Sequence, residues 1–373
     1  MNIKRNSIIL TFLLILSSCS AKNDDKSNEV IDVISKVNTY WQENNKPQVN
    51  SFWDNAAYHT GNMEAYSITQ DPLYLNYSKD WAIHNEWKGA KSDNKEKWKY
   101  SYGESDDFVL FGDFQICFQT YCDLYNIEPA DYKIARAIEV MEYQMSTDKN
   151  DYWWWADGLY MVMPVMTKLY NITGNELYLE KLYEYLKYAD SIMYDKEAHL
   201  YYRDDRYTFP KHKTRSGHKD FWSRGNGWVF AGFAKVLQDL PADAKYREVY
   251  LKRFKEMAKS IASSQQTEGH WTRSMLDAEQ APGQETSGTA FFTYGFLWGI
   301  NNGVLDKKEY SQIAENGWNY LSTVALQEDG KVGYVQPIGD RAIPGQVIDA
   351  NSTTNFGVGA FLLAASEMYR YVK

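Results

Sequence analysis

A short pattern, in which a polar turn is followed by a tyrosine and an amphipathic helix, recurs along this chain of 373 residues. The tyrosines of the pattern are Tyr74, Tyr132, Tyr178, Tyr246 and Tyr310. A more apolar stretch rich in small residues precedes each copy, and a last one ends the chain: about 52–68, 107–126, 156–172, 223–239, 286–302 and 352–371. Apolar residues at three- and four-residue steps predict helices. Recurrence of one such unit indicates a repeat architecture.

The two kinds of helix belong in two layers. A helix that is apolar most of the way round lies inside a fold, whereas a helix with a Lys/Glu face lies outside. With a further outer helix at Val30–Trp41, the pattern predicts an all-α (α/α)6 barrel of six inner and six outer helices, as a single domain over residues 30–373. An open helical array is the alternative, because a barrel closes only if the last inner helix meets the first.

The N-terminus carries the pattern of an export signal. Residues 1–18 contain two basic residues before an apolar run (8–16) that is too short to span a bilayer. Residues 16–19 (LSSC) resemble the bacterial lipobox, which predicts cleavage before Cys19, a lipid on Cys19 and a flexible tether at 19–29. A plain secretory signal is the alternative. We expect a lipoprotein of the bacterial outer membrane that contacts the membrane only through its lipid.

Composition and motifs exclude several classes of function. The formal net charge of −9 disfavours a nucleic-acid partner. Three cysteines cannot form a disulfide framework, and Cys117 and Cys122 are expected to be buried thiols. The sequence contains no HExxH, EF-hand, Walker, GxSxG or CxxC motif, so we expect no metal and no cofactor. We expect a monomer. Aromatic residues make up 16% of the chain, as a sugar-binding cleft requires, although they also fill cores.

The predicted barrel brings the N-terminal ends of all inner helices to one mouth, where their free N–H groups favour an anionic ligand. The sharpest segment there is 153–161 (WWWADGLYM), in which Asp157 follows three tryptophans that include Trp155. Apolar surroundings raise the pKa of a carboxyl group and make it a proton donor near neutral pH. An N-cap aspartate with packing tryptophans is the alternative. Asp113 lies in an otherwise apolar helix, so it needs a partner there.

Other polar groups start further inner helices. Arg224 could hold a carboxylate while Trp222 or Trp228 stacks on a sugar ring, or it could tie a loop to Asp220. Thr286 and Ser287 supply hydroxyl groups, with helix capping as the alternative. His59 is the best lone histidine, although a buried structural role is the commoner one. Also at inner-helix starts are Trp53, Asp54, Asp107, Glu285 and residues 352–355.

The segment 203–219 is basic in an otherwise acidic protein, and it begins with Arg203. A polyanionic substrate would be drawn to such a segment, and a solvated loop is the simpler interpretation.

Three ordered motifs give the chain a specific likeness. Segments 154–161 (WWADGLYM), 222–228 (WSRGNGW) and 285–290 (ETSGTA) resemble those of glycoside hydrolase family 105, the unsaturated rhamnogalacturonyl and glucuronyl hydrolases, which is similar to family 88. The likeness covers about residues 30–373. It implies an (α/α)6 barrel that removes a 4,5-unsaturated uronic acid from the non-reducing end of lyase-generated oligosaccharides.

The resemblance also implies roles for residues. Asp157 would protonate C4 of the enol ether and assist the addition of water to C5, and Asp113 matches the second family aspartate. Arg224 would hold the uronate, with Trp222 and Trp228 stacking on it. Many relatives that act on pectin fragments carry a histidine where this chain has Arg203, which disfavours galacturonides and suggests a sulfated, ulvan-type substrate.

Three rival interpretations stay open. The first is a hydrolase of unsaturated rhamnogalacturonan fragments. The second is a lyase or a hydrolase of saturated glycosides on the same barrel. The third is a surface lipoprotein that binds glycans without cleaving them.

Overall fold

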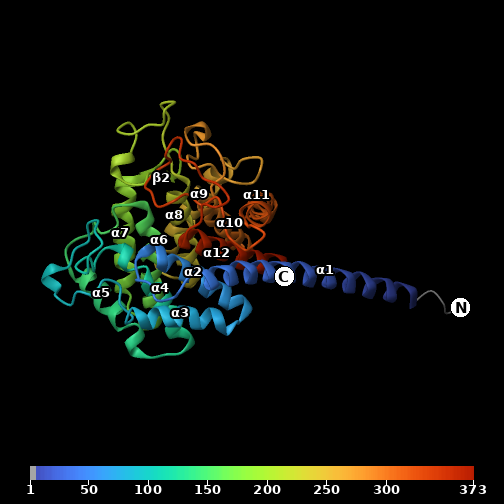
Figure 1. Ribbon diagram of the computed structural model, residues 1–373, viewed down its shortest axis with the longest axis horizontal. Coiled ribbons are helices and arrows are strands. Elements are labelled where there is room, and N and C mark those ends of the chain that lie inside the picture. The colour runs from blue at the N-terminus through green and yellow to red at the C-terminus, as the bar shows by residue number, and fades with distance from the viewer. Residues whose placement is uncertain (1–5) are drawn as a thin grey trace.

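A computed structural model describes residues 6–373, with side chains from residue 25 onward. Two layers of helices alternate along the chain (Figure 1). The inner helices are α2 (Trp53–Thr69), α4 (Cys117–Ile127), α6 (Ala156–Thr173), α8 (Ser223–Asp239), α10 (Thr286–Asn301) and α12 (Asn355–Val372). The outer helices are α1 (Asn6–Asn44), α3 (Pro72–His84), α5 (Ala135–Ser146), α7 (Leu177–Met193), α9 (Arg247–Ala262) and α11 (Lys307–Tyr320).

Short elements join these helices. Strands β1 (Tyr194–Asp195) and β2 (Leu200–Tyr201) form an antiparallel hairpin after α7. Single helical turns are η1 (Lys95–Lys97), η2 (Gly112–Phe114), η3 (Asp131–Lys133), η4 (Asp205–Tyr207), η5 (Ala278–Gln280) and the π-turn η6 (Leu321–Ala325). Most of these lie in the long loops that reach the inner helices, and η2 becomes part of the candidate site.

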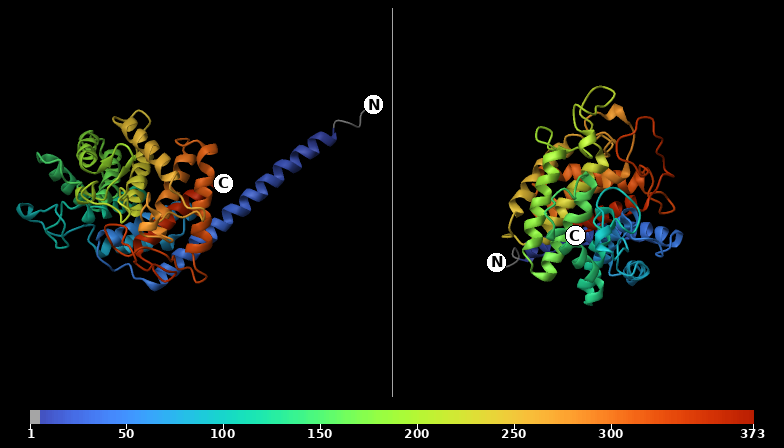
Figure 2. Two further views of the ribbon diagram at one scale, coloured as in Figure 1. Left: turned by 90° about the horizontal axis from the view of Figure 1, so that it is seen from above. Right: turned by 90° about the vertical axis from the view of Figure 1, so that its left-hand side faces the viewer.

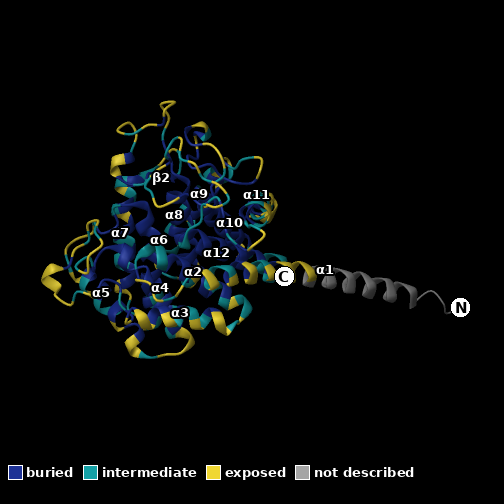
Figure 3. Cartoon of the chain, in the orientation of Figure 1, coloured by how far each residue is buried: buried dark blue, intermediate teal, exposed yellow. Residues whose placement is uncertain are grey.

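Burial separates the layers as the sequence predicts. Every residue of α10 from Thr286 to Ile300 is buried, whereas α9 buries one stripe and exposes a Lys/Glu face. Figure 3 shows this contrast between the centre and the rim of the molecule. Most of the core is one hydrophobic cluster that draws on all the inner helices, and Trp222, Ala281 and Ala342 form a second, small one. The predicted division into inner and outer helices is therefore confirmed.

The barrel is closed. Each inner helix packs against the next, and α12 packs against α2. At that seam two glycines bring the backbones together, because a Cβ on Gly61 would lie 2.1 Å from the carbonyl oxygen of Gly359. Glycine is the residue that permits such close approach. The predicted (α/α)6 barrel is confirmed, and the open helical array is wrong.

The N-terminal helix extends beyond the body of the molecule (Figure 2). The part predicted as an outer helix is docked, since Val30, Ile34 and Val37 are buried. Residues 19–29, where a flexible tether was expected, continue α1, and neither proline nor glycine interrupts the helix there. Among the described residues, no helix combines the length and apolarity that crossing a bilayer needs. The side chain of Cys19 and those of the proposed signal lie outside the described residues, so both stay predictions.

Candidate active site

Two buried carboxyl groups meet at the mouth of the barrel. Asp157 lies in the first turn of α6 and is 9% exposed, and Asp113 lies in η2 and is 6% exposed. Asp113 is not within a long helix as expected, because α4 begins only at Cys117. Trp155, not Asp157, occupies the N-cap of α6, so the capping interpretation of Asp157 is wrong. Asp157 Oδ2 is buried and has no hydrogen-bond partner among the described residues.

The environment of this pair favours its protonated form. Burial raises the pKa of the Asp113 carboxyl well above its usual range, and the neighbouring charge of Asp157 raises it further. Burial also raises the pKa of Asp157, while the positive charges of Arg203 and Arg224 oppose that rise. Carboxyl groups that interact this closely titrate together. The pair can therefore hold a proton at a pH where ordinary carboxyl groups have lost theirs.

The tryptophans before Asp157 have different positions. Trp153 and Trp155 are buried, and the Trp155 ring packs against Gly112 and Gly158, where a Cβ would come within 3.0–3.1 Å of it. Trp155, predicted to bind substrate, therefore supports the turns that carry the two aspartates. Trp154 is the one that lines an open hollow. The Trp154 ring stacks with Phe111, and the Arg203 guanidinium lies over it. These contacts depend on tertiary packing, so the sequence could not predict that Trp154 lines the hollow.

A hollow of about 440 Å³ opens beside Asp157, and we call it the arginine hollow. It is lined by Tyr102, Trp154, Arg203, Arg206, Ile338, Gly339 and Asp340. Arg203 Nε lies 3.6 Å from Asp157 Oδ2, and its guanidinium lies over the Trp154 ring. Arg203 and Arg206 share the single carboxylate of Asp204. Positive charge is thus concentrated next to the candidate proton donor.

The rest of the basic segment is largely neutralised. Ion pairs join Lys211 to Asp205, and Lys219 to Asp195 and Glu197. The rings of His212 and His218 face Asp220 and Asp277. Attraction of a polyanion by the whole segment is consequently weaker than its sequence suggests, although Arg203 and Arg206, which share one carboxylate, still line the arginine hollow.

Arg224 is fixed by the backbone of a distant loop. Its Nη1 donates to the carbonyl oxygen of Gln336 at 2.6 Å, and its Nη2 donates to that of Pro337 at 2.9 Å. The guanidinium lies between the rings of Trp222 and Phe356, with centroids at 4.6 and 4.7 Å. Burial lowers its pKa to about 10.

Trp222 secures the same loop. Its Nε1 donates to Gln336 Oε1 at 2.8 Å. Arg224 and Trp222 therefore position the segment that carries Ile338 into the arginine hollow. The alternative tie from Arg224 to Asp220 is wrong, because Asp220 binds Ser274 and His212.

Three residues predicted to bind substrate lie inside the barrel wall. Trp228 is fully buried against Tyr160 and Phe291. Thr286 Oγ1 donates to the carbonyl oxygen of Gly333, and Ser287 Oγ donates to Glu285 Oε1. Glu285 also accepts the backbone N–H groups of residues 287 and 288. The capping interpretation of this motif is thus the one that the structure favours.

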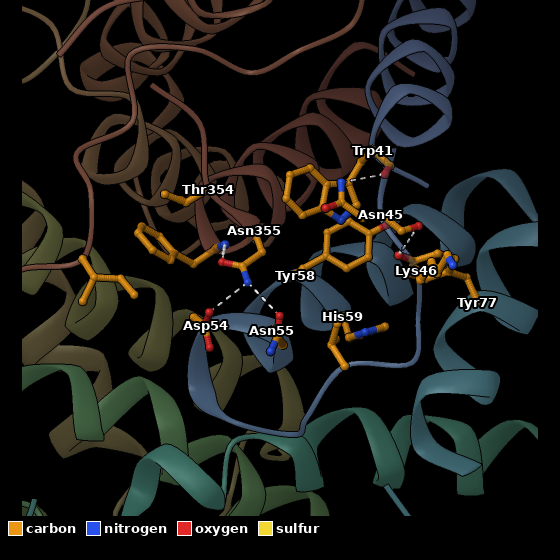
Figure 4. A pocket seen from close by; sticks show the side chains of 13 residues that line it. Trp41, Asn45, Lys46, Asp54, Asn55, Tyr58, His59, Tyr77, Thr354 and Asn355 are labelled. Atoms are coloured by element: carbon orange, nitrogen blue, oxygen red, sulfur yellow. Dashed lines mark hydrogen bonds between the residues drawn. The ribbon is translucent and has the colours of Figure 1, made fainter. Parts of the chain in front are cut away.

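His59 lies at a second hollow, of about 300 Å³, at the seam between α2 and α12 (Figure 4). We call it the amide hollow, because Asn45, Asn55 and Asn355 line it. The His59 ring is buried, stacks on Trp81 at 4.0 Å and bonds Ser78. Burial lowers its pKa well below the usual range, so His59 is a neutral, structural part of the floor.

Asp54 and Ile338 are the residues that connect the amide hollow to the site. Asp54 starts α2, and its charge contributes to the raised pKa of Asp113. Its carboxylate accepts from the Asn355 amide at 3.1 Å, as Figure 4 shows. Ile338 lines both hollows. Asp54 was foreseeable from its place at an inner-helix start, whereas Tyr102 and Ile338 lie in loops without a sequence motif.

Among the described residues, no three His, Cys, Asp or Glu side chains converge as metal ligands would.

Comparisons with known proteins agree with this architecture. The sequence profile of Glycosyl Hydrolase Family 88 matches residues 26–372. An unsaturated 3S-rhamnoglycuronyl hydrolase of Formosa agariphila is 35% identical over 329 residues, which are 85% of this chain and 84% of the relative. A solved family 88 glycosyl hydrolase from Bacteroides vulgatus is 65% identical, with a TM-score of 0.91 over 93% of this chain and 99% of that one. A structure described as a polysaccharide lyase is 72% identical, with a TM-score of 0.90 over 92% and 98%.

The fold and the site define this protein as an enzyme, a glycoside hydrolase built on an (α/α)6 barrel. The chain belongs to glycosyl hydrolase family 88. The family resemblance drawn from the three sequence motifs is confirmed at this level.

Proposed function

We propose that the enzyme removes a 4,5-unsaturated uronic acid, of the glucuronate type, from the non-reducing end of oligosaccharides that polysaccharide lyases release. The observation that carries this proposal is the buried pair of Asp157 and Asp113, whose pKa values are raised by burial, beside Arg203. The Formosa relative, which is named as an unsaturated rhamnoglycuronyl hydrolase, supports it.

The proposed reaction is hydration of the enol ether. The carboxyl group of Asp157 gives its proton to C4, and the positive charge that develops at C5 is shared with the ring oxygen. Water adds to C5, and its proton returns to the carboxylate. The hemiketal opens at the bond between C5 and the ring oxygen, which leaves a ketone at C5 and a hemiacetal at C1. The hemiacetal collapses to an aldehyde, and the rest of the oligosaccharide leaves as the alcohol, taking up the hemiacetal proton. In this reaction no carboxylate displaces the leaving group. The distance between the two carboxyl groups therefore does not distinguish a retaining from an inverting mechanism.

One assay tests the proposal against its rivals. Lyase-generated oligosaccharides are incubated with the enzyme while the ultraviolet absorbance of the conjugated uronate is followed. Hydration predicts loss of absorbance, and Asp157→Asn should reduce the rate by about 10²-fold or more. Asp148→Asn, at an exposed position that lines neither hollow, is the matched control and should keep the full rate. Unchanged absorbance with retained binding would indicate a glycan-binding protein instead.

A lyase is the second candidate, because the 72% identical structure is described as a polysaccharide lyase. A lyase creates the C4=C5 bond, so absorbance would rise on an intact, saturated polysaccharide. The Formosa relative is named as an unsaturated rhamnoglycuronyl hydrolase and not as a lyase, which favours hydration.

The narrower proposal is a sulfated, ulvan-type substrate with rhamnose 3-sulfate next to the unsaturated glucuronate. The name of the Formosa relative supports it, as does Arg203 at the position where a histidine was expected for galacturonides. Matched sulfated and desulfated disaccharides test it, and equal kcat/KM for both would remove its support. Higher turnover of unsaturated rhamnogalacturonan fragments would favour the pectin alternative.

We also propose that the mature protein is a monomeric lipoprotein of the outer membrane, acylated at Cys19. Labelled palmitate should be incorporated into the full chain in bacterial cells, and Cys19→Ala should abolish both the label and membrane retention. Incorporation that survives the substitution would refute this assignment.

A further inference from the structure

The direction in which α1 leaves the body is fixed by its contacts with α2. The Gln42 amide donates to the Tyr58 hydroxyl at 3.0 Å, and the Asn38 amide donates to Asn62 Oδ1 at 2.7 Å. Residue numbers thus fall along α1 while they rise along α2, so the two helices are antiparallel. Because α2 starts at the mouth, the N-terminal side of α1 leads to the opposite end of the barrel, which we call the base.

α1 is held against the barrel down to the base. Val30, Ile34 and Val37 are buried on one face of α1, which packs against both α2 and α12. Asn45, directly after α1, lines the amide hollow beside the start of α2. The helix between Val30 and Asn45 is about 22 Å long at about 1.5 Å per residue, and the 17 residues of α2 span about 25 Å. Val30 therefore lies close to the level at which α2 ends, at Thr69.

α1 continues beyond the base without a break. It extends N-terminally from Val30 as one helix, and Figure 2 shows it projecting from the body. Neither glycine nor proline, the residues that most disfavour a helix, occurs between Cys19 and Asn44. The helix from Cys19 to Val30 adds about 16 Å, so Cys19 lies about 40 Å along α1 from the mouth. We call residues 19–29 the stalk.

The base itself has an acidic surface. The turns that join inner helices to outer helices there contain more carboxylates than lysines. The carboxylates are Asp71, Glu128, Asp131, Glu176, Asp243 and Asp306, and the lysines are Lys133 and Lys245. Both lysines form ion pairs with glutamates. An anionic lipid surface repels such a face. The stalk, and not adsorption of the base, would therefore set how the barrel is placed over a membrane.

We propose that α1 is a rigid stalk that turns the base of the barrel toward a lipid surface and the mouth away from it. This inference rests on the acylation of Cys19 that we proposed above. The carboxyl pair and the arginine hollow then open toward the solution, from which the oligosaccharide arrives. A flexible tether has no preferred direction and would let the mouth turn toward the lipid.

The first test measures which end of the barrel lies nearer the lipid. The chain from Cys19 onward is coupled through the Cys19 thiol to a maleimide lipid in vesicles of phosphatidylethanolamine and phosphatidylglycerol. The other two cysteines are buried, which protects them from this reaction. An encoded azide carries a donor dye at one exposed position, either 347 in the loop at the mouth or 131 or 243 at the base, and the vesicles contain an acceptor lipid.

We expect energy transfer from positions 131 and 243 to be about twofold or more that from position 347, because the two ends lie about 22 Å apart along α1. Equal transfer from all three positions, or stronger transfer from position 347, would overturn the proposal.

The rigidity of the stalk is the second test. Replacement of residues 20–26 by glycine and serine should bring the transfer efficiencies of the mouth and base positions closer together, because the link then becomes a flexible coil. Replacement of the same residues by alanine and glutamate, which favour a helix, is the matched control and should preserve the difference. A difference that survives in the glycine–serine variant would show that the stalk does not set the orientation.

This proposal and the proposed lipoprotein fail separately. Cells that incorporate no palmitate at Cys19 refute the lipoprotein, whereas the vesicle experiment couples its lipid chemically and still reports the orientation. Palmitate incorporation combined with equal energy transfer from mouth and base supports the lipoprotein and refutes the orientation.

Discussion

Replacing Arg203 by methionine should move the alkaline limb of the pH–rate profile upward. Arg203 Nε lies 3.6 Å from Asp157 Oδ2, and both side chains are more than four-fifths buried. At that distance the Coulomb attraction of two unit charges is about 4–5 kcal/mol for an effective dielectric constant of 20. Asp204 competes for the same guanidinium at 2.7 Å, so we take about half of this attraction as acting on Asp157. The loss of Arg203 should therefore remove about 2 kcal/mol of stabilisation from the Asp157 carboxylate, and so raise the pKa of Asp157.

The sign follows from the role of the carboxyl group. Asp157 acts as a proton donor, so activity falls as pH rises through the pKa of the carboxyl pair. A positive neighbour lowers that pKa, and its removal extends activity to higher pH. The assay is kcat for the unsaturated disaccharide, from absorbance loss, between about pH 4 and 9. Methionine keeps much of the side-chain volume over Trp154.

Arg206→Met is the matched control. Arg206 binds the same Asp204 carboxylate through Nε and Nη2 but has no contact with Asp157. Its loss should weaken substrate binding and leave the alkaline limb in place. An alkaline limb that stays fixed or moves downward in Arg203→Met would refute the assignment of Asp157 as the proton donor that Arg203 modulates.

Three further changes test other parts of the argument. Asp113→Asn should lower kcat by about 10²-fold with little change in the unfolding midpoint, because the carboxyl pair loses its second ionisable group. A kcat close to that of the wild type would exclude Asp113 from the reaction. Lys168→Met should lower the free energy of unfolding in urea by about 3 kcal/mol or more, since Asp123 and Asp239 then lose their buried cation; a loss below about 1 kcal/mol would contradict this. Gly61→Ala should destabilise by about 3 kcal/mol, because its Cβ meets the Gly359 backbone, and unchanged calorimetric stability would argue against that close seam.

The sequence predicts the layers of the barrel because burial leaves its mark on composition. An inner helix such as α10 is apolar and small-residue-rich on every side, and an outer helix such as α9 keeps one charged face. The position of Asp157 at the mouth follows from that order, since it starts an inner helix. The sequence could not establish that the barrel closes. Only three-dimensional packing shows that Gly61 of α2 meets Gly359 of α12.

The individual side chains of the site were predicted less well, for a physical reason. The sequence places three tryptophans before Asp157, but packing around Gly112 and Gly158 decides that Trp155 is buried and Trp154 faces the hollow. Trp228 has the right spacing from Arg224 but points into the core. A motif fixes which residues share a helical turn, whereas the partner elements decide which side of that turn is open.

The two arginines of the site illustrate the same limit and sharpen the substrate argument. A guanidinium grips a carboxylate best when two parallel N–H groups are free. Arg224 donates from Nη1 and Nη2 to backbone carbonyl oxygens, and two rings enclose it, so its main effect is to hold the loop that carries Ile338. Arg203 lines the open hollow, and its buried Nε has no hydrogen-bond partner among the described residues. The uronate carboxylate should therefore pair with Arg203 in the arginine hollow.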